Sequence, residues 1–434
     1  MRVRWMLVCL LGALVLGIAA CGDDDDDDDG GGGAEGPSLE LTIGNLVPQT
    51  GALSPFAPAG EKAIGLAVDE INAAIEEVGA DHTINSLTDD TQTDPQAGTQ
   101  AARKQAGEGA TCFNGAWASS VTIPVAESVS SREEILQLSP ASTSPEITGL
   151  EDDDFVFRSA PADTGQGQLL TRVIEQTLGN PEGKTLNIGA RNDAYGTGLT
   201  EELSNAWEEA GGTVGETVIY ELKQPSYNSE AQQIVSGNPD AIMIVDFPEP
   251  FDKVGAALVR TGDWDPEKAF VSDGLALPNL GELAGADVAD GMVATAPGSP
   301  QGGAGDAFDE LWDETGGPVQ APFNAQNFDN VMLCYLAAVA AGSTDGADMA
   351  GVLRDVSGAP GEEYTFEELP AAIEALQNGD DIDFQGASGD LEFDNAGDPR
   401  SGVYDVFRVR PEELEKTEEV PYEDGQLVGG GQGG

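Results

Sequence analysis

The sequence has few of the side chains that enzymes use for acid–base and nucleophilic chemistry. Its 434 residues include one histidine, His82, which falls in a polar segment away from every other motif and is expected at the surface. No Ser/His/Asp or Cys/His set can be assembled around it. The four cysteines lack metal-ligand spacing, and no GxxxxGK[ST] loop is present. The sequence therefore predicts no enzyme activity, no metal site and no cofactor.

Basic residues are also scarce. There are 19 Lys and Arg against 78 Asp and Glu, which gives a formal net charge of −59. This balance excludes nucleic acid as a partner. Carboxylate pairs such as Asp89–Asp90 are weak candidates for acid/base groups, because so many acidic residues favour a solvated face. The acidity fits a salty habitat, where screening weakens self-repulsion, and it equally fits a compositional bias of the lineage.

One segment near the start is long and apolar enough to suggest a secretory signal peptide. Arg2 and Arg4 precede the apolar run 5–20, the pattern of a secretory signal peptide over residues 1–20. Ile18-Ala19-Ala20-Cys21 resembles the lipobox of bacterial lipoproteins, which implies cleavage before Cys21 and acylation of its thiol. An uncleaved membrane anchor is the alternative, although the run is short for a span. Seven consecutive Asp and the following glycines predict an extended tether over residues 21–38.

The rest of the chain alternates apolar strands with amphipathic helices. LELTIGNLV (39–47) indicates a buried strand, and apolar residues then recur at helical spacing over 61–78. The alternation continues to residue 273, which predicts the α/β class with parallel sheets. It restarts near residue 160, and the length suits two lobes rather than one core. Residues 411–434 are acidic and Gly-rich, and we expect a disordered tail there.

Small hydroxyl residues follow two neighbouring predicted strands. GAWASSVTIP (115–124) places Ser119 and Ser120 at the start of a helix, with Pro124 expected in its first turn. SPASTSPEIT (139–148) follows the strand predicted over 135–138. Each hydroxyl alone is explained by capping of a turn. The carboxyl ends of adjacent parallel strands form a ligand-binding edge, so together these segments predict a site for a carboxylate or phosphate.

These two motifs, followed by FRSAPAD (157–163), resemble the leucine/isoleucine/valine-binding proteins of bacterial amino-acid ABC transporters. The resemblance spans residues 39–409. It implies the type I periplasmic-binding-protein fold, with two lobes that each contain a mostly parallel sheet flanked by helices, and with three crossing segments at the hinge. Lobe 1 would then comprise 39–161 and 297–399, and lobe 2 would comprise 162–296 and 400–410.

The resemblance also implies a function. It predicts a monomeric, extracytoplasmic solute-binding protein, anchored to the cell membrane by lipid, that captures an amino acid between its lobes. The partners would be that amino acid and the subunits of an ABC permease. A hydrolytic or lyase enzyme on a similar scaffold and the sensory ectodomain of a receptor are the alternatives from other classes.

The resemblance also implies a ligand contact for each residue whose motif matches the family. Ser119 would donate to the ligand carboxylate, Thr143 would reach both the carboxylate and the ammonium, and the Ala141 carbonyl would accept from the ammonium. Asp273, in VSDG, falls where the family grips the ammonium, with Asp163 in support. The aromatic residues expected to close over the ligand are Tyr195, Phe247 and Phe56. Ordinary core packing is the alternative for each aromatic side chain, and a strand-end cap is the alternative for Asp273.

Departures from the family pattern leave the ligand open. Phe56 and Phe247 stand where members often carry Trp or Tyr, so any hydroxyl contact is missing. Asp246 is expected to put a charge near the mouth of the site, which favours a polar or cationic side chain. A branched-chain or other apolar amino acid is the main expectation. An amide, a urea-like compound or a small carboxylic acid is the alternative.

Two cysteines remain once Cys9 leaves with the signal peptide and Cys21 takes lipid. Cys112 and Cys334 are both placed in lobe 1 by the arguments above. Outside the cytoplasm such a pair tends to form a disulfide. Two buried free thiols are the alternative, because the sequence does not show the separation of the Cα atoms.

Overall fold

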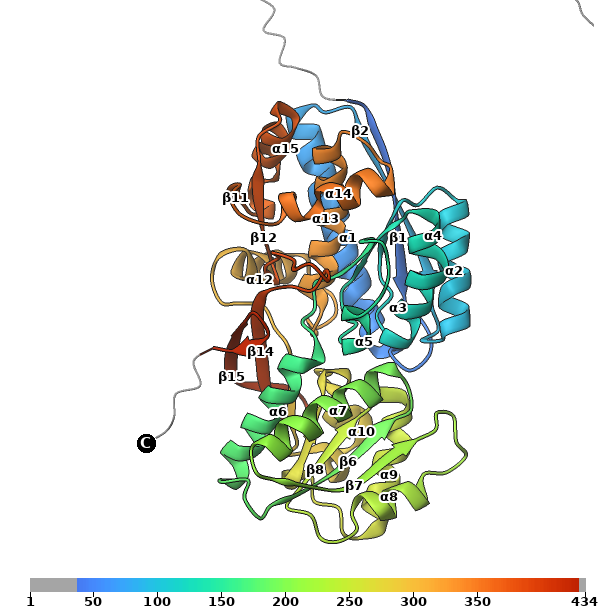
Figure 1. Ribbon diagram of the computed structural model, residues 1–434, viewed down its shortest axis with the longest axis vertical. Coiled ribbons are helices and arrows are strands. Elements are labelled where there is room, and N and C mark those ends of the chain that lie inside the picture. The colour runs from blue at the N-terminus through green and yellow to red at the C-terminus, as the bar shows by residue number, and fades with distance from the viewer. Residues whose placement is uncertain (1–36, 429–434) are drawn as a thin grey trace, which may run out of the picture. The chain divides into compact units, whose positions relative to one another are not determined.

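The computed structural model describes residues 37–428 (Figure 1). The predicted signal peptide, Cys21 and nearly all of the tether lie outside this range. The first sheet contains five parallel strands in the order β2-β1-β3-β4-β5. Its strands are β1 (Leu39–Val47), β2 (His82–Asp90), β3 (Cys112–Asn114), β4 (Leu136–Ser139) and β5 (Val156–Arg158).

Helices cover this first sheet and bury β1, β3, β4 and β5, which explains the nearly continuous apolar run of β1, whereas the edge strand β2 is mostly exposed or half-buried. They include α1 (Ala57–Val78), α2 (Pro95–Gly107), α13 (Asn324–Ala341), α14 (Gly346–Val356) and α15 (Leu369–Asn378). Helix α13 is buried from Asn324 to Val339, so it is a core helix rather than an amphipathic surface helix. Within this core Cys334 of α13 is bonded to Cys112 of β3, with 6.0 Å between the two Cα atoms.

The second sheet has eight strands in the order β16-β15-β14-β10-β9-β8-β6-β7. The parallel part comprises β6 (Thr185–Arg191), β7 (Thr213–Tyr220), β8 (Ala241–Val245), β9 (Ala269–Val271) and β10 (Val293–Pro297). Helices α6 (Asp163–Leu178) and α7 (Ala194–Glu209) pack together on one face, and α8 (Asn228–Ile234) and α9 (Pro248–Thr261) on the other (Figure 1). Lobe 1 and lobe 2 below denote the first and second sheets with the helices packed on them.

The chain passes between the two sheets three times. The passages run from β5 to α6, from β10 to α12 (Gly303–Thr315), and from β13 (Gly389–Asp390) to β14 (Ser401–Val409). Arg158, at the end of β5, is fully buried, and its Nη2 donates to Asp398 Oδ2 over 2.8 Å. Its Nη1 donates to the Ser144 carbonyl over 2.9 Å. The first and third passages are thereby tied to the loop that follows β4.

The prediction of a disordered tail over 411–434 is wrong for most of its length. Strand β15 (Leu414–Glu423) pairs antiparallel with β14, and β16 (Gln426–Leu427) pairs with β15. Val420 and Tyr422 are buried against the sheet, whereas the many acidic side chains of the strand are mainly on its outer face. Because so many of these residues are charged, the sequence did not reveal a strand whose side chains point alternately to a buried face and to a solvated face.

Two local predictions also differ from the structure. Helix α3 (Ser119–Val125) begins at Ser119, so Pro124 lies inside it, and a π-helical turn (Ala126–Ser130) follows. A proline cannot donate to the preceding turn, and irregular helix geometry is usual beside one. His82 is buried rather than at the surface. Its Nδ1 lies 2.9 Å from the Tyr335 hydroxyl, and burial lowers its pKa.

Candidate functional site

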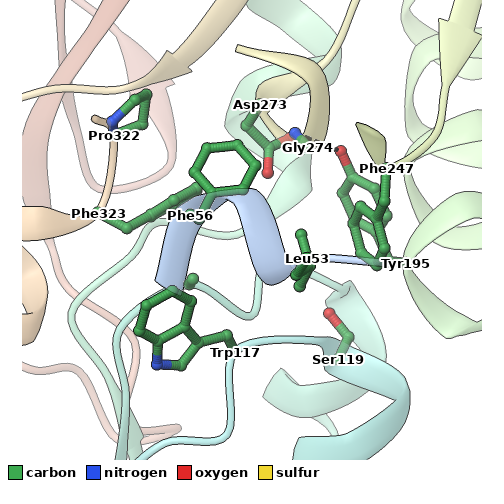
Figure 2. Close-up of a pocket in the computed structure, with 11 residues that line it drawn as sticks. Leu53, Phe56, Trp117, Ser119, Tyr195, Phe247, Asp273, Gly274, Pro322 and Phe323 are labelled. Carbon is green, nitrogen blue, oxygen red and sulfur yellow. Dashed lines mark hydrogen bonds between the residues drawn. The ribbon is translucent and has the colours of Figure 1, made fainter. Parts of the chain in front are cut away.

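A small cavity lies where the loops at the carboxyl ends of the two sheets meet (Figure 2). It is lined by Leu53, Phe56, Trp117, Ser119, Ala141, Tyr195, Phe247, Asp273, Gly274, Pro322 and Phe323. The structure thus brings together six of the residues that the sequence assigned to a ligand. Thr143 and Asp163 lie immediately behind them, joined by a 2.8 Å hydrogen bond from the Asp163 N–H to the Thr143 carbonyl. The cavity measures about 20 Å³, room for one water molecule.

A sharp turn after β3 positions Ser119. Gly115 has φ +135°, and a Cβ there would lie 2.8 Å from the Leu46 carbonyl oxygen, so only glycine fits. The chain then places Ser119 in the first turn of α3, where backbone N–H groups lack partners within the helix. The Ser144 N–H donates to Ser119 Oγ over 3.2 Å, which joins the two hydroxyl-rich loops. This wall can offer donors to a carboxylate.

Asp273 and Tyr195 form the facing polar wall, which comes from lobe 2. Asp193 caps α7 by accepting from the Gly196 N–H over 3.0 Å, which places Tyr195 in the first turn. The Tyr195 hydroxyl lies 2.7 Å from Asp273 Oδ1 and 2.6 Å from Ser272 Oγ. Tyr195 therefore holds the Asp273 carboxylate in place, a role that the sequence did not reveal.

Phe247 is packed between two other side chains. Its ring stacks on Tyr195 with 5.3 Å between centroids, and the Arg191 guanidinium covers its other face at 3.6 Å. Arg191 pairs in turn with Asp193 and Asp246. The expectation of a charge near the mouth at Asp246 is wrong. Asp246 is fully buried behind the aromatic wall and accepts a 2.8 Å hydrogen bond from the Tyr220 hydroxyl.

Two buried carboxylates dominate the electrostatics. Burial raises the pKa of Asp273 to about 6, with the hydrogen bond from Tyr195 opposing the shift. Burial and then the charge of Asp273 raise the pKa of Asp163 well above its ordinary value. The Thr143 hydroxyl is near enough to lower that pKa, but neither it nor the Asp163 carboxylate makes a hydrogen bond of standard geometry within residues 37–428. Asp273 has the Tyr195 hydroxyl as a partner, whereas the Asp163 carboxylate lacks the hydrogen bonds that a buried charge requires.

No lysine or arginine is among the residues that line the cavity. The cation that acts on Asp163 is Arg158, whose guanidinium is already bonded to Asp398. The pair of carboxylates therefore lacks a counter-ion of its own, and a ligand with a positive group would satisfy it. Across the described part of the chain, no group of His, Cys, Asp and Glu is arranged to hold a metal ion. No helix within residues 37–428 has the length and apolarity needed to span a bilayer.

Sequence reasoning missed five lining residues: Leu53, Trp117, Gly274, Pro322 and Phe323. Trp117 lies inside the GAWASS motif, and its ring rests on α1, where a Cβ on Gly60 would come within 2.1 Å of it. The signal that could have identified Trp117 was its place as an aromatic residue inside a motif already expected to bind the ligand. Pro322 and Phe323 come from the loop before α13, far from every strand end, and no periodic pattern marks them.

A family model described as periplasmic binding protein matches residues 40–398. The chemotactic signal transduction system substrate-binding protein BasB of Halobacterium salinarum is 26% identical, over 83% of this chain and 85% of its own. The Leu/Ile/Val-binding protein homolog 1 of Brucella abortus is 24% identical, over 85% and 90%. The branched-chain amino acid transporter substrate-binding protein LivJ of Streptococcus pneumoniae, solved with isoleucine, superposes with a TM-score of 0.71 over 88% and 99%, at 17% identity.

The family predicted from the motifs and its type I fold are thus confirmed. By their names, BasB belongs to a signalling system, LivJ belongs to a transporter, and the Brucella relative is a Leu/Ile/Val-binding protein homolog. The match covers the first sheet and strands β6 to β10 of the second, and it ends within the third passage, before β14. The chain belongs to the periplasmic binding protein family, and within that family it is similar to the leucine/isoleucine/valine-binding proteins.

Proposed function

We propose that the protein captures an amino acid with an apolar side chain between its lobes and delivers it to an ABC permease. The observation that carries this proposal is the pair of buried carboxylates, Asp163 and Asp273, without a cation of their own. Asp273 faces a wall that carries Ser119 and the start of a helix, and the remaining walls are apolar or aromatic. The ammonium, the carboxylate and the apolar side chain of an amino acid match these three surfaces.

The proposed contacts are those that the family motifs imply, and the positions of the lining residues support them. Asp273 pairs with the ligand ammonium, and Asp163 supports it from behind. Ser119 donates to the ligand carboxylate, the Ala141 carbonyl accepts from the ammonium, and Thr143 reaches both groups once the ligand is in place. The aromatic side chains that close over the ligand are Tyr195, Phe247 and Phe56.

Delivery requires that the lobes separate and close. A cavity of about 20 Å³ cannot admit an amino acid, so entry needs a more open form. In the present form Ser144 Oγ donates to the Ala194 carbonyl over 3.0 Å, a contact between lobes that opening would break. A ligand bound to both walls shifts the equilibrium toward the closed form, which docks on the permease.

The anchor and the ligand class belong to the same proposal. Acylation of Cys21 would hold the protein at the outer face of the cell membrane, and Cys21→Ala should release it into the aqueous phase of a detergent partition. Retention of that variant with the detergent would contradict the lipid anchor. An amide, a urea-like compound or a small carboxylic acid is the alternative ligand. Because BasB, by its name, serves chemotactic signalling, presentation of the ligand to a signal transducer is a second candidate function.

A thermal-shift screen against the twenty amino acids and simple amides tests the function. A ligand that binds only the folded state raises Tm, by an amount that grows with its concentration relative to Kd. We expect an apolar amino acid to give the largest shift and to be recovered unchanged afterwards. A shift produced by amides or benzoate-like acids alone would replace the proposed ligand class, and turnover of the bound compound would indicate an enzyme.

Binding should weaken as the pH falls below about 6. Asp273 of the free protein has a pKa of about 6, and only the ionised form pairs with an ammonium. At pH 5 about one tenth of it is ionised, so affinity should be roughly tenfold lower than at pH 8. Binding at pH 6 should also release protons, measured by calorimetry in two buffers of different ionisation enthalpy. An affinity that does not change between pH 8 and pH 5 would contradict pairing of Asp273 with a cation.

The same carboxyl affects the stability of the free protein with the opposite sign. Its pKa is raised above the unfolded value of about 4, so its contribution to stability is full below pH 4 and is lost as the pH rises through about 6. We therefore expect ligand to protect the protein most at neutral pH, where the free protein carries the unpaired charge.

A further inference from the structure

A second and larger cavity adjoins the ligand site. It measures about 930 Å³ and shares two lining residues, Pro322 and Phe323, with the cavity described above. We call it the distal chamber. Its other walls come from the start of α1, the segment after β9, the second passage between the sheets, and β14 with the turn that follows, and they include Pro58, Leu277, Asn279, Ser299 and Phe407. Pro322 and Phe323 thus separate the ligand site from a much roomier space.

The partition lies at the apolar end of the ligand site. Figure 2 shows Phe323 and Phe56 next to each other, on the side away from the stacked rings of Tyr195 and Phe247. A ligand whose charged groups contact Ser119 and Asp273 therefore points its apolar part toward Phe56 and Phe323. Its side chain would meet the partition first and the distal chamber beyond it.

The backbone of Phe323 has a left-handed conformation, with φ +71° and ψ 3°, which is uncommon for a bulky side chain. Flanking hydrogen bonds hold it there. The Ala321 N–H donates to Asn324 Oδ1 over 2.7 Å, and Asn327 Nδ2 donates to the Phe323 carbonyl over 2.9 Å. The backbone is thus fixed while the ring stands between two cavities. A strained conformation that the surroundings maintain points to a functional role for the side chain it orients.

We propose that the distal chamber receives the end of the ligand side chain and that the Phe323 ring turns aside to admit it. The ligand is then an amino acid with a side chain longer than that of leucine, aromatic or otherwise extended. This inference rests on the proposed function, because the charged groups of the ligand must first be held by Ser119 and Asp273. The chamber wall carries Glu282, Asp309, Asp405, Glu412 and Glu413 against one lysine, Lys416, which pairs with Asp405, so an anionic side chain is disfavoured there.

Calorimetry with leucine and tryptophan as the two probes tests this assignment. Asn279 lines the chamber, is exposed and makes no capping hydrogen bond, so Asn279→Trp narrows the chamber at little risk to folding. Leu283→Trp is the matched control, because it adds the same ring on the adjoining helix α10 (Leu280–Ala284) at a position 47% exposed that does not line the chamber. Phe323→Ala removes the partition itself.

The wild type should bind tryptophan about tenfold more tightly than leucine, at the low end of what shape selection in a pocket provides. Asn279→Trp should lose about tenfold for tryptophan and at most about twofold for leucine, with Leu283→Trp unchanged for both. Phe323→Ala should weaken leucine and spare tryptophan. Binding of leucine without tryptophan, or equal losses for both probes in Asn279→Trp, overturns the inference and leaves the proposed function standing. If none of the twenty amino acids binds, both fail.

Discussion

Replacing Asp273 with alanine should lower the affinity for the ligand by about two to four powers of ten. The carboxylate is 3% exposed and forms one side of the pocket, so an ammonium bound there is paired away from water. Removing one partner of a buried charge pair costs about 3–5 kcal/mol, because the other charge stays buried without compensation. Isothermal titration with the ligand that gives the largest thermal shift measures the loss.

The fold should survive this substitution. Asp273 accepts from Tyr195 but has no cationic partner, and burial raises its pKa, so at neutral pH the free protein carries an unfavourable charge there. We expect Tm of the unliganded Asp273→Asn and Asp273→Ala proteins at pH 8 to be no lower than that of the wild type. If the Asp273→Ala protein is unfolded, its low affinity does not report on the carboxylate. The isosteric Asp273→Asn protein then tests the role of the carboxylate.

Ser119→Ala and Glu201→Ala complete the comparison. Ser119→Ala removes a hydroxyl but leaves the backbone donors of α3, so we expect a loss of about 1.5–3 kcal/mol in binding, typical of a hydrogen bond to a charged group. Glu201 is an exposed acid on α7 and should change affinity by less than twofold. If Asp273→Ala binds as tightly as Glu201→Ala, the ligand has no ammonium group at this position.

The fold class could be predicted from the sequence because its signals are local and repeated. Buried parallel strands such as β1 give short apolar runs, and the intervening helices have an apolar face at helical spacing. The failures arose where composition concealed a local pattern. In β15 the acidic side chains outnumber the buried Val420 and Tyr422, so the segment resembled a disordered tail until its pairing with β14 was known. The burial of His82 likewise depends on Tyr335, a contact between residues far apart in sequence.

The candidate site could be predicted only in part, because some of its features depend on contacts between elements far apart in the sequence. Residues at strand ends, such as Ser119 and Asp273, lie in motifs that a sheet must bring to one edge. Whether a side chain faces the pocket or lies behind it depends on packing. The isolation of Asp163 and the burial of Asp246 behind Phe247 follow from contacts between elements that no spacing encodes. Phe323 lies in a loop whose left-handed conformation is set by its flanking hydrogen bonds.

Reduction of the Cys112–Cys334 disulfide should lower the free energy of unfolding by about 2–5 kcal/mol, because a cross-link between distant residues restricts the unfolded chain. The two residues are 222 positions apart, so the loop that the bond closes is long, and the chain-entropy estimate lies near the top of this range. Urea unfolding of the oxidised and the dithiothreitol-treated protein at one pH measures the difference.

The location of the bond makes the loss relevant to ligand binding as well. Cys112 begins the strand that leads to Trp117 and Ser119, and Cys334 lies in the helix that begins directly after Phe323. Reduction should therefore weaken binding only through the population of folded protein, since the core around both buried residues keeps the two segments in place. The Cys112→Ala/Cys334→Ala protein is the control, and its stability should not respond to dithiothreitol. Alkylation of both thiols in the native protein without reduction would show that the bond is absent, and an unchanged urea midpoint on reduction would show that it contributes nothing to stability.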